Sequence, residues 1–227
     1  MNSVSSKVRG VLTGILVLTL SSLAFAGALT DKVDKLFAQW DKPDSPGCAL
    51  GVIQKGKFIY KRGYGIASLE HSVPITPTSV FYIGSTSKQF TAANVVLAAE
   101  QGYLSLDDDI RKYLPELPDY GTAITIRHLI HHTSGLRDYL MLMQLAGMPY
   151  EDVYTDEEIV ALVARQKALN FKSGDEHLYS NSGYFLLSQI VKRATGKSLR
   201  AFAEENIFKG NVTIRNLLLS ELGPQAG

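Results

Sequence analysis

The segment Ser87–Gln101 constrains the fold of this chain more than any other part of the sequence. Wound into a helix, it is apolar on nearly every side, because Phe90, Val95 and Leu97 alternate with alanines around the circumference. A helix of this kind belongs in the interior of a protein. Gly102 is placed to end it. The sequence therefore predicts a buried central helix with the rest of the domain packed around it.

A nucleophile and a candidate base stand at the start of this helix, in Ser85-Thr-Ser-Lys88. Residues three apart lie on one helix face, with about 5–6 Å between their Cβ atoms. Serine is a weak nucleophile and needs a base within hydrogen-bond reach. A lysine kept from water loses part of its preference for the charged form and can accept the serine proton. Because N–H groups at a helix start can also face a developing oxyanion, the motif predicts nucleophilic catalysis.

A second polar motif, Tyr179-Ser180-Asn181, precedes another predicted helix, Ser182–Ala194. In an extended segment residues two apart point to the same side, so the phenol of Tyr179 and the amide of Asn181 would face one space. The phenol can move a proton, and the amide can bind a substrate carbonyl or Lys88. The alternative is a plain loop in which Asn181 caps the helix.

The remaining pattern predicts one small sheet and several helices, an α/β fold of the α+β kind. Cys48–Gln54 and Lys57–Gly65 are two strands of a β-hairpin, joined by a tight turn at Lys55-Gly56. A lone hairpin is marginal and usually needs more strands. Glu70–Ser79, with two prolines, is predicted as loop. Further helices are expected at the apolar stripe Val33, Leu36, Phe37 and Trp40, at Leu106–Leu114, at Thr125–His132, after the capping box Thr155–Glu158, and at Ser198–Phe208.

Charge and the N-terminal segment limit the partners and the location. The formal net charge of +1 and the lack of a Lys/Arg run argue against nucleic acid as a partner. Lys7 and Arg9, the apolar run Val11–Leu20 and Ala24-Phe25-Ala26 have the form of a secretory signal peptide over residues 1–26. The run is shorter than the roughly 20 residues that span a bilayer. We therefore expect cleavage after Ala26, no stable membrane anchor afterwards, and a periplasmic or secreted protein.

Together, these motifs resemble the serine β-lactamase and penicillin-binding-protein superfamily, whose S-x-x-K signature has the same mechanics. The likeness is greatest to the branch that contains class C β-lactamases, D-Ala-D-Ala carboxypeptidases and related esterases. It is carried by Phe81–Ala92, Gly102–Asp107, Ile126–Leu136 and Tyr179–Tyr184. The expected organisation is a signal peptide over 1–26, an incomplete β-lactamase-related domain over 27–209, and a divergent tail over 210–227.

The resemblance implies a β-lactamase/transpeptidase-like fold and a role for each motif residue. Ser85 would be the acylated nucleophile, Lys88 its activating partner, and Tyr179 the general base that acts with Lys88. Asn181 would bind the substrate amide or the lysine, and the Ser85 N–H would supply half of an oxyanion hole. The site implied in this way needs no metal or cofactor, and its partner is a small-molecule or peptide substrate.

After the stretch Asn206–Lys209 the sequence departs from the family pattern. A third motif, a Lys-Thr-Gly or His-x-Gly strand, and the C-terminal strands of the sheet are expected to be missing. That strand gives the second oxyanion donor, and loss of one such donor typically costs roughly 100- to 1000-fold in rate.

Two hypotheses for the function remain. The chain is a secreted serine hydrolase acting through an acyl-enzyme on β-lactams, D-Ala-D-Ala peptides or esters, or it is a catalytically inactive remnant or a binding module of the same fold.

Other kinds of site are less well supported. His128, His131 and His132 lack the H-E-x-x-H spacing and a defined third ligand, so a structural role is favoured over zinc. The sequence has no G-x-S-x-G elbow. Gly196-Lys-Ser198 resembles the end of a phosphate loop, but Val191 stands where the first glycine would be.

Overall fold

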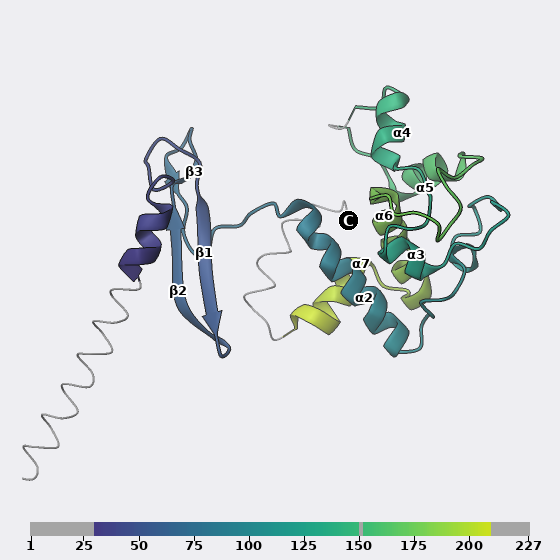
Figure 1. The fold of residues 1–227 in the computed structure, drawn as a ribbon, viewed down its shortest axis with the longest axis horizontal. Helices are drawn as coiled ribbons and strands as arrows, with labels where there is room; N and C mark the ends of the chain where they lie inside the picture. The colour runs from purple at the N-terminus through teal and green to yellow at the C-terminus, as the bar shows by residue number, and fades with distance from the viewer. Residues whose placement is uncertain (1–29, 150–151, 210–227) are drawn as a thin grey trace, which may run out of the picture. The chain divides into compact units, whose positions relative to one another are not determined.

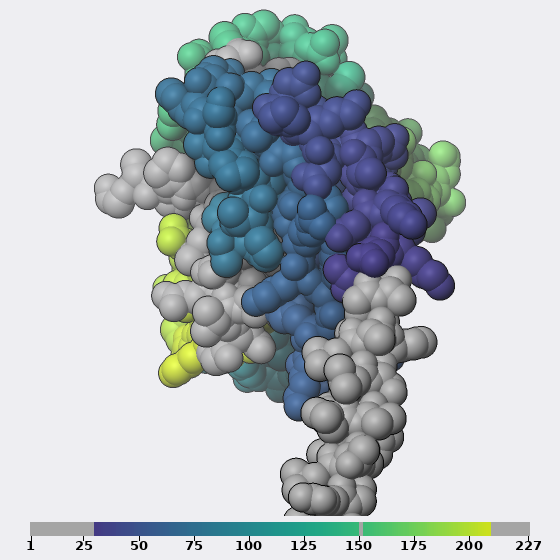
Figure 2. Space-filling view, turned by 90° about the vertical axis from the view of Figure 1, so that its left-hand side faces the viewer, coloured from purple at the N-terminus to yellow at the C-terminus, as the bar shows by residue number. Residues whose placement is uncertain are grey.

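The computed structural model describes residues 30–149 and 152–209. The predicted signal peptide and the predicted tail therefore lie outside the described residues. The described residues divide into two compact units, one that ends at Val80 and one that begins at Phe81. The first is drawn in purple and blue, and the second in teal to yellow (Figures 1 and 2). Of the described helices, none is long and apolar enough to cross a membrane.

The first unit is built on the predicted hairpin. Strands β1 (Cys48–Gln54) and β2 (Lys57–Tyr64) pair antiparallel, with a bulge between Val52 and Ile53. The turn residues Lys55 and Gly56 have φ of +49° and +74°. A two-residue turn with both φ values positive matches the right-handed twist of the strands. The hairpin prediction is confirmed.

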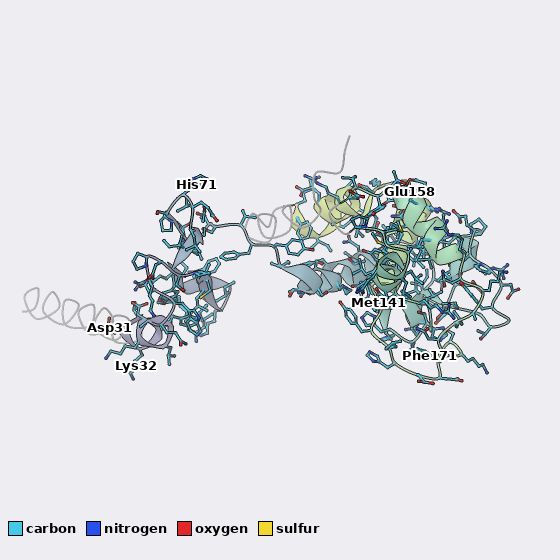
Figure 3. The ribbon with its side chains drawn as sticks, turned by 90° about the horizontal axis from the view of Figure 1, so that it is seen from above. Asp31, Lys32, His71, Met141, Glu158 and Phe171 are labelled. Carbon is cyan, nitrogen blue, oxygen red and sulfur yellow. The ribbon has the colours of Figure 1, made fainter. Side chains whose placement is uncertain are left out.

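A second, smaller pairing follows in the same unit. Strands β3 (Ile66–Ser68) and β4 (Val73–Pro74) pair antiparallel, and His71 lies in the turn between them (Figure 3). The prediction of an unbroken loop over Glu70–Ser79 is therefore wrong at β4. Proline lacks an N–H but can end a short edge strand, where no donor is required of it.

A helix over residues 30–37 accompanies the hairpin. Phe37 stacks on Tyr64 of β2, with ring centroids 5.1 Å apart. Leu36 is 71% exposed and Trp40 41% exposed, so the predicted apolar stripe is not buried at these two positions.

Directed polar contacts tie this helix to β2. The Asp34 carboxylate accepts hydrogen bonds from the phenols of Tyr60 and Tyr64, and it pairs with Arg62 at 2.5 Å. Tyr64 is fully buried. The hydrogen bond from Tyr60 outweighs the opposing effect of burial and, with Tyr64 and Arg62, holds the pKa of Asp34 below its ordinary 3.8. The helix is thus oriented by one carboxylate with three partners.

The core of the second unit lies between α2 (Lys88–Glu100) and α6 (Asn181–Thr195), which pack together (Figure 1). Side chains from both helices are fully buried there, together with those of neighbouring segments: Val95, Ala98, Leu114, Ile126, Leu129, Leu186, Leu187, Ile190 and Val191.

The helix α2 is less buried than the sequence predicts. Its buried side chains are Asn94, Val95 and Ala98, whereas Val96 is 39% exposed. Among the described residues, α6, α7 (Leu199–Ala203) and η3 (Glu204–Phe208) pack against α2, and they cover only part of its circumference. The prediction of a helix buried on nearly every side is wrong for the part of the chain described.

Several predicted helices are confirmed at their ends. Thr155 and Glu158 form the capping box of α5 (Asp156–Ala164), where Glu158 is labelled in Figure 3. Thr125 caps α3 (Ile126–Ile130). The helix α6 ends at Gly196, whose φ is +73°, as expected for a glycine after a helix. Ser198 caps α7, which continues into a π-helical turn, η3 (Glu204–Phe208).

Two segments differ from expectation. Leu106–Leu114 is not one helix, because only η2 (Ile110–Lys112) is helical, and as a 3-10 turn. The side chains of Asp108 and Asp109 accept hydrogen bonds from nearby backbone N–H groups, which favours turns over a regular helix. The helix α4 (Tyr139–Leu145), capped by Asp138, was not predicted.

Candidate active site

Ser85 lies in a 3-10 turn, η1 (Gly84–Ser87), that leads directly into α2. In a 3-10 turn residues three apart are eclipsed along the axis. The side chains of Ser85 and Lys88 therefore meet, and Lys88 Nζ donates to Ser85 Oγ at 3.1 Å. Gly84, with a φ of +52°, supplies the left-handed backbone that starts the turn. The three-residue spacing thus places the amine beside the hydroxyl.

The second predicted motif meets the first. The phenol of Tyr179 is hydrogen-bonded to Ser85 Oγ at 2.6 Å. Lys88 Nζ also donates to Asn181 Oδ1, at 3.0 Å, and lies 4.9 Å from the centre of the Tyr179 ring. All four predicted residues, Ser85, Lys88, Tyr179 and Asn181, therefore share one hydrogen-bonded cluster.

The cluster opens to solvent on the side of the nucleophile. Ser85 is exposed and Tyr179 is 47% exposed, while Lys88 and Asn181 are half-buried. The Ser85 hydroxyl is therefore accessible to a substrate from solvent, whereas Lys88 and Asn181 are partly covered by protein.

The electrostatics of the cluster favour proton transfer to Tyr179. Burial raises the pKa of the phenol, but hydrogen bonds with Lys88 and Ser85 outweigh it, and the pKa lies below its ordinary 10.0. A lower pKa increases the fraction of phenolate near neutral pH, and phenolate is the form that can accept the proton of Ser85.

Ser180 orients the second motif. It is extended, with φ −140° and ψ 126°, and its hydroxyl accepts from the Gly183 N–H as the N-cap of α6. The alternative in which Asn181 caps the helix is therefore wrong. Asn181 is instead the first residue of α6, and its Oδ1 binds Lys88, which leaves the Nδ2 side of the amide as a donor for a substrate carbonyl.

Two residues that the sequence did not mark also hold this motif. The Asp138 carboxylate accepts from the Asn181 N–H and, through its other oxygen, from the Leu140 N–H at the start of α4. His132 Nδ1 accepts from the Ser180 N–H at 3.1 Å. Asp138 could have been found as an aspartate just before an apolar run, the usual N-cap signal. His132 lies in a stretch singled out by the resemblance but was considered only as a metal ligand or a structural residue.

The remaining histidines of the predicted cluster have separate surroundings. His128 Nδ1 accepts from the Thr125 N–H in the capping box of α3 and also meets the Ser173 hydroxyl at 2.8 Å. His131 is exposed. Within residues 30–149 and 152–209, no three His, Cys, Asp or Glu side chains gather in a group that could hold a metal ion.

Two curated proteins are among the relatives of this chain. A D-aminopeptidase of Gluconobacter oxydans is 31% identical over 198 residues, which are 87% of this chain and 37% of that protein. Penicillin-binding protein 4* of Bacillus subtilis is 34% identical over 154 residues, which are 67% of this chain and 34% of that protein. The chain thus spans about a third of the length of these relatives.

Solved structures agree with this relationship. An octameric penicillin-binding protein homologue from Pyrococcus abyssi aligns with a TM-score of 0.66 and 28% identity, covering 80% of this chain and 42% of that one. A D-amino acid amidase from Ochrobactrum anthropi SV3 aligns with a TM-score of 0.61 and 29% identity, covering 72% of this chain and 44% of that one. The fold is β-lactamase/transpeptidase-like, whereas likeness to class C enzymes in particular stays a prediction.

The family model described as Beta-lactamase matches residues 33–218, which include the whole Ser85, Lys88, Tyr179 and Asn181 cluster. This chain belongs to the beta-lactamase family of serine hydrolases, the family that also contains penicillin-binding proteins and D-aminopeptidases.

Proposed function

We propose that this chain forms an acyl-enzyme on Ser85. Its proposed substrates are β-lactams and amides, peptides or esters whose acyl group is a D-amino acid. One observation supports this above all. Ser85 Oγ lies within hydrogen-bond reach of both the Tyr179 phenol, at 2.6 Å, and Lys88 Nζ, at 3.1 Å. An activated nucleophile requires such a base at hydrogen-bond distance.

In the proposed reaction the members of the cluster act together in both half-reactions. Tyr179, as phenolate stabilised by Lys88, takes the proton of Ser85 while Oγ forms a bond to the substrate carbonyl carbon. Asn181 donates from its amide to the substrate. The bond from that carbon to the leaving nitrogen or oxygen then breaks, and the leaving group takes the proton back from Tyr179. Water then attacks the ester between the acyl group and Ser85 while Tyr179 takes its proton. The ester bond to Oγ breaks, Oγ takes the proton back from Tyr179, and the acid leaves with the Ser85 hydroxyl restored.

The names of the relatives support this proposed substrate class. The Gluconobacter protein is named a D-aminopeptidase and the Ochrobactrum structure a D-amino acid amidase. Both names describe cleavage beside a D-amino acid, and the penicillin-binding relative adds β-lactams. We further propose that the protein is secreted or periplasmic, as the form of residues 1–26 suggests.

The experiment is covalent labelling of the purified chain with a fluorescent fluorophosphonate and a fluorescent penicillin, followed by hydrolysis of D-amino acid anilides. We expect labelling that is lost in Ser85→Ala. Ser87→Ala is the matched control, since the Ser87 hydroxyl lies in the same turn but donates to the Gly84 carbonyl at 2.8 Å.

Labelling that persists in Ser85→Ala would contradict the assignment of the nucleophile. If the folded chain binds penicillin reversibly but neither label attaches, the alternative of a non-catalytic binding module is supported instead. L-amino acid anilides, run beside the D-forms, test the substrate class separately from the nucleophile.

A further inference from the structure

His132 holds the chain on both sides of Tyr179. Its carbonyl accepts from the Leu178 N–H at 2.9 Å, and its ring Nδ1 accepts from the Ser180 N–H at 3.1 Å. The residues before and after the tyrosine are therefore fixed by one residue from another segment. His132 itself has a φ of +57°, in the left-handed region, which turns its ring and carbonyl toward the segment from Leu178 to Ser180.

The ring of His132 also packs on the tyrosines of the site. Its centroid is 4.6 Å from that of Tyr179 and 5.1 Å from that of Tyr184. Lys88 Nζ lies over the same two rings, at 4.9 Å and 5.6 Å. The imidazole is thus in direct contact with the group proposed to take the proton of Ser85.

We propose that His132 is a positioning residue, which holds Tyr179 against Ser85 only while its imidazole is neutral. Nδ1 accepts a hydrogen bond in that state, so the ring proton is on Nε2. A second proton on Nδ1 would set an N–H against the Ser180 N–H and break the hydrogen bond. Acylation of Ser85 would then fall as the pH decreases. This inference rests on the proposed function of the site.

The surroundings of His132 keep it neutral at physiological pH. Burial, and then the charges of His177 and Lys88, lower its pKa below the ordinary 6.5, and His131 acts in the same direction. A hydrogen bond with the Ser180 backbone raises this pKa but is outweighed. Tyr179 and Tyr184 are the tyrosines in contact with its ring, and the His177 ring lies edge-on to it at 5.9 Å. Because the pKa is lowered, the neutral form persists below pH 6.5 and is lost only as the pH falls through the lowered value.

Two substitutions separate the hydrogen bond from the backbone. Glycine and asparagine both accept a positive φ with little strain. His132→Gly removes the acceptor and the ring, whereas His132→Asn keeps an acceptor oxygen near the Ser180 N–H and does not titrate. His131→Asn, at the exposed neighbouring position, is the control.

The measurement is the inactivation rate by a fluorophosphonate, kinact, and its binding constant, KI, across pH. At neutral pH we expect kinact of His132→Gly to fall about tenfold or more, the effect of losing one hydrogen bond, with KI unchanged. His132→Asn should restore most of kinact. The wild type and His131→Asn should each lose kinact in acid with the pKa that NMR gives for the His132 ring of that same protein, and His132→Asn should lack this ionisation.

If His132→Asn still shows the ionisation at the pKa of the wild-type His132 ring, or if His132→Gly keeps full kinact, the inference is overturned. If the wild type is not labelled at any pH, the proposed function fails, and amide exchange at Ser180 then reports on the role of His132 by itself. Protection of that amide should fall when the His132 ring is protonated and in His132→Gly. If the Ser180 amide is as well protected in acid and in His132→Gly as in the neutral wild type, the role of His132 is refuted.

Discussion

At the scale of single residues, Lys88 connects the parts of the site. Its ammonium donates to Ser85 Oγ and to Asn181 Oδ1, at 3.1 Å and 3.0 Å, and lies over the Tyr179 ring. One side chain thus contacts the proposed nucleophile, the proposed base and the amide. Its charge also favours the phenolate form of Tyr179.

Replacing Lys88 tests this position. Lys88→Met keeps the length of the side chain but removes both hydrogen bonds and the charge. We expect Ser85 labelling to slow by about 100- to 10,000-fold, the range for losing a group that assists proton transfer. The thermal unfolding midpoint should change little. Lys172→Met, at an exposed lysine, is the control, and near-normal labelling of Lys88→Met would remove Lys88 from the mechanism.

The sequence predicts the four members of the site but not the residues that hold them. Helical spacing brings Ser85 and Lys88 together. Spacing in an extended segment places Tyr179 and Asn181 on one side, so each motif can be recognised from local geometry alone. His132 contributes through contacts with a segment 48 residues away. No local period reports such a contact, because it depends on how two loops pack.

At the scale of elements, the described helix ends are set by short polar motifs. Thr155 accepts from the Glu158 N–H, and Glu158 accepts from the Thr155 N–H, which satisfies donors at both positions of the α5 start. Such motifs are local, and the sequence predicted this one. The helix predicted over Leu106–Leu114 was wrong, because aspartates there compete for backbone N–H groups. The burial predicted for α2 was also wrong, because it depends on neighbouring elements.

Thr155→Ala should destabilise the second unit by about 1 kcal/mol, within the range of about 0.5–2 kcal/mol for losing an N-cap. The free energy of unfolding in urea, followed by circular dichroism, gives this value. Thr155→Ser keeps the hydroxyl and should lie close to the wild type. A serine variant as unstable as the alanine variant would show that the methyl group, and not the cap, supplies the stability.

At the scale of the whole molecule, the two compact units have different sources of order. The second has an apolar core between α2 and α6, whereas the first combines a hairpin with the Asp34 carboxylate and its three partners. The sequence predicted the α+β class. The boundary between Val80 and Phe81 was not predicted, since no run of glycine, serine or charge marks it.

Acid should therefore destabilise the first unit through Asp34. The pKa of Asp34 is lowered, so its stabilising contribution is complete above the ordinary 3.8 and is lost as the pH falls through the lower folded value. Asp34→Asn should reproduce this loss at neutral pH. Hydrogen-exchange protection should fall in β2 and stay constant in α6.

Asp31→Asn, on the same helix at an exposed position, is the matched control for this experiment (Figure 3). Equal loss of protection in β2 and α6 would show that the two units open together. Unchanged protection in β2 would show that the carboxylate is not needed to order the hairpin.

The left-handed backbone at His132 also restricts which residues evolution or a saturation library can place there. At a φ of +57° β-branched and bulky residues are strained, and glycine, asparagine, aspartate and histidine are favoured. Selection for folding alone would thus enrich a short set of residue types at this codon. Enzymatic selection then acts within that set, so under the role proposed for His132 asparagine is the substitution that would remove the acid response and still allow the chain to fold.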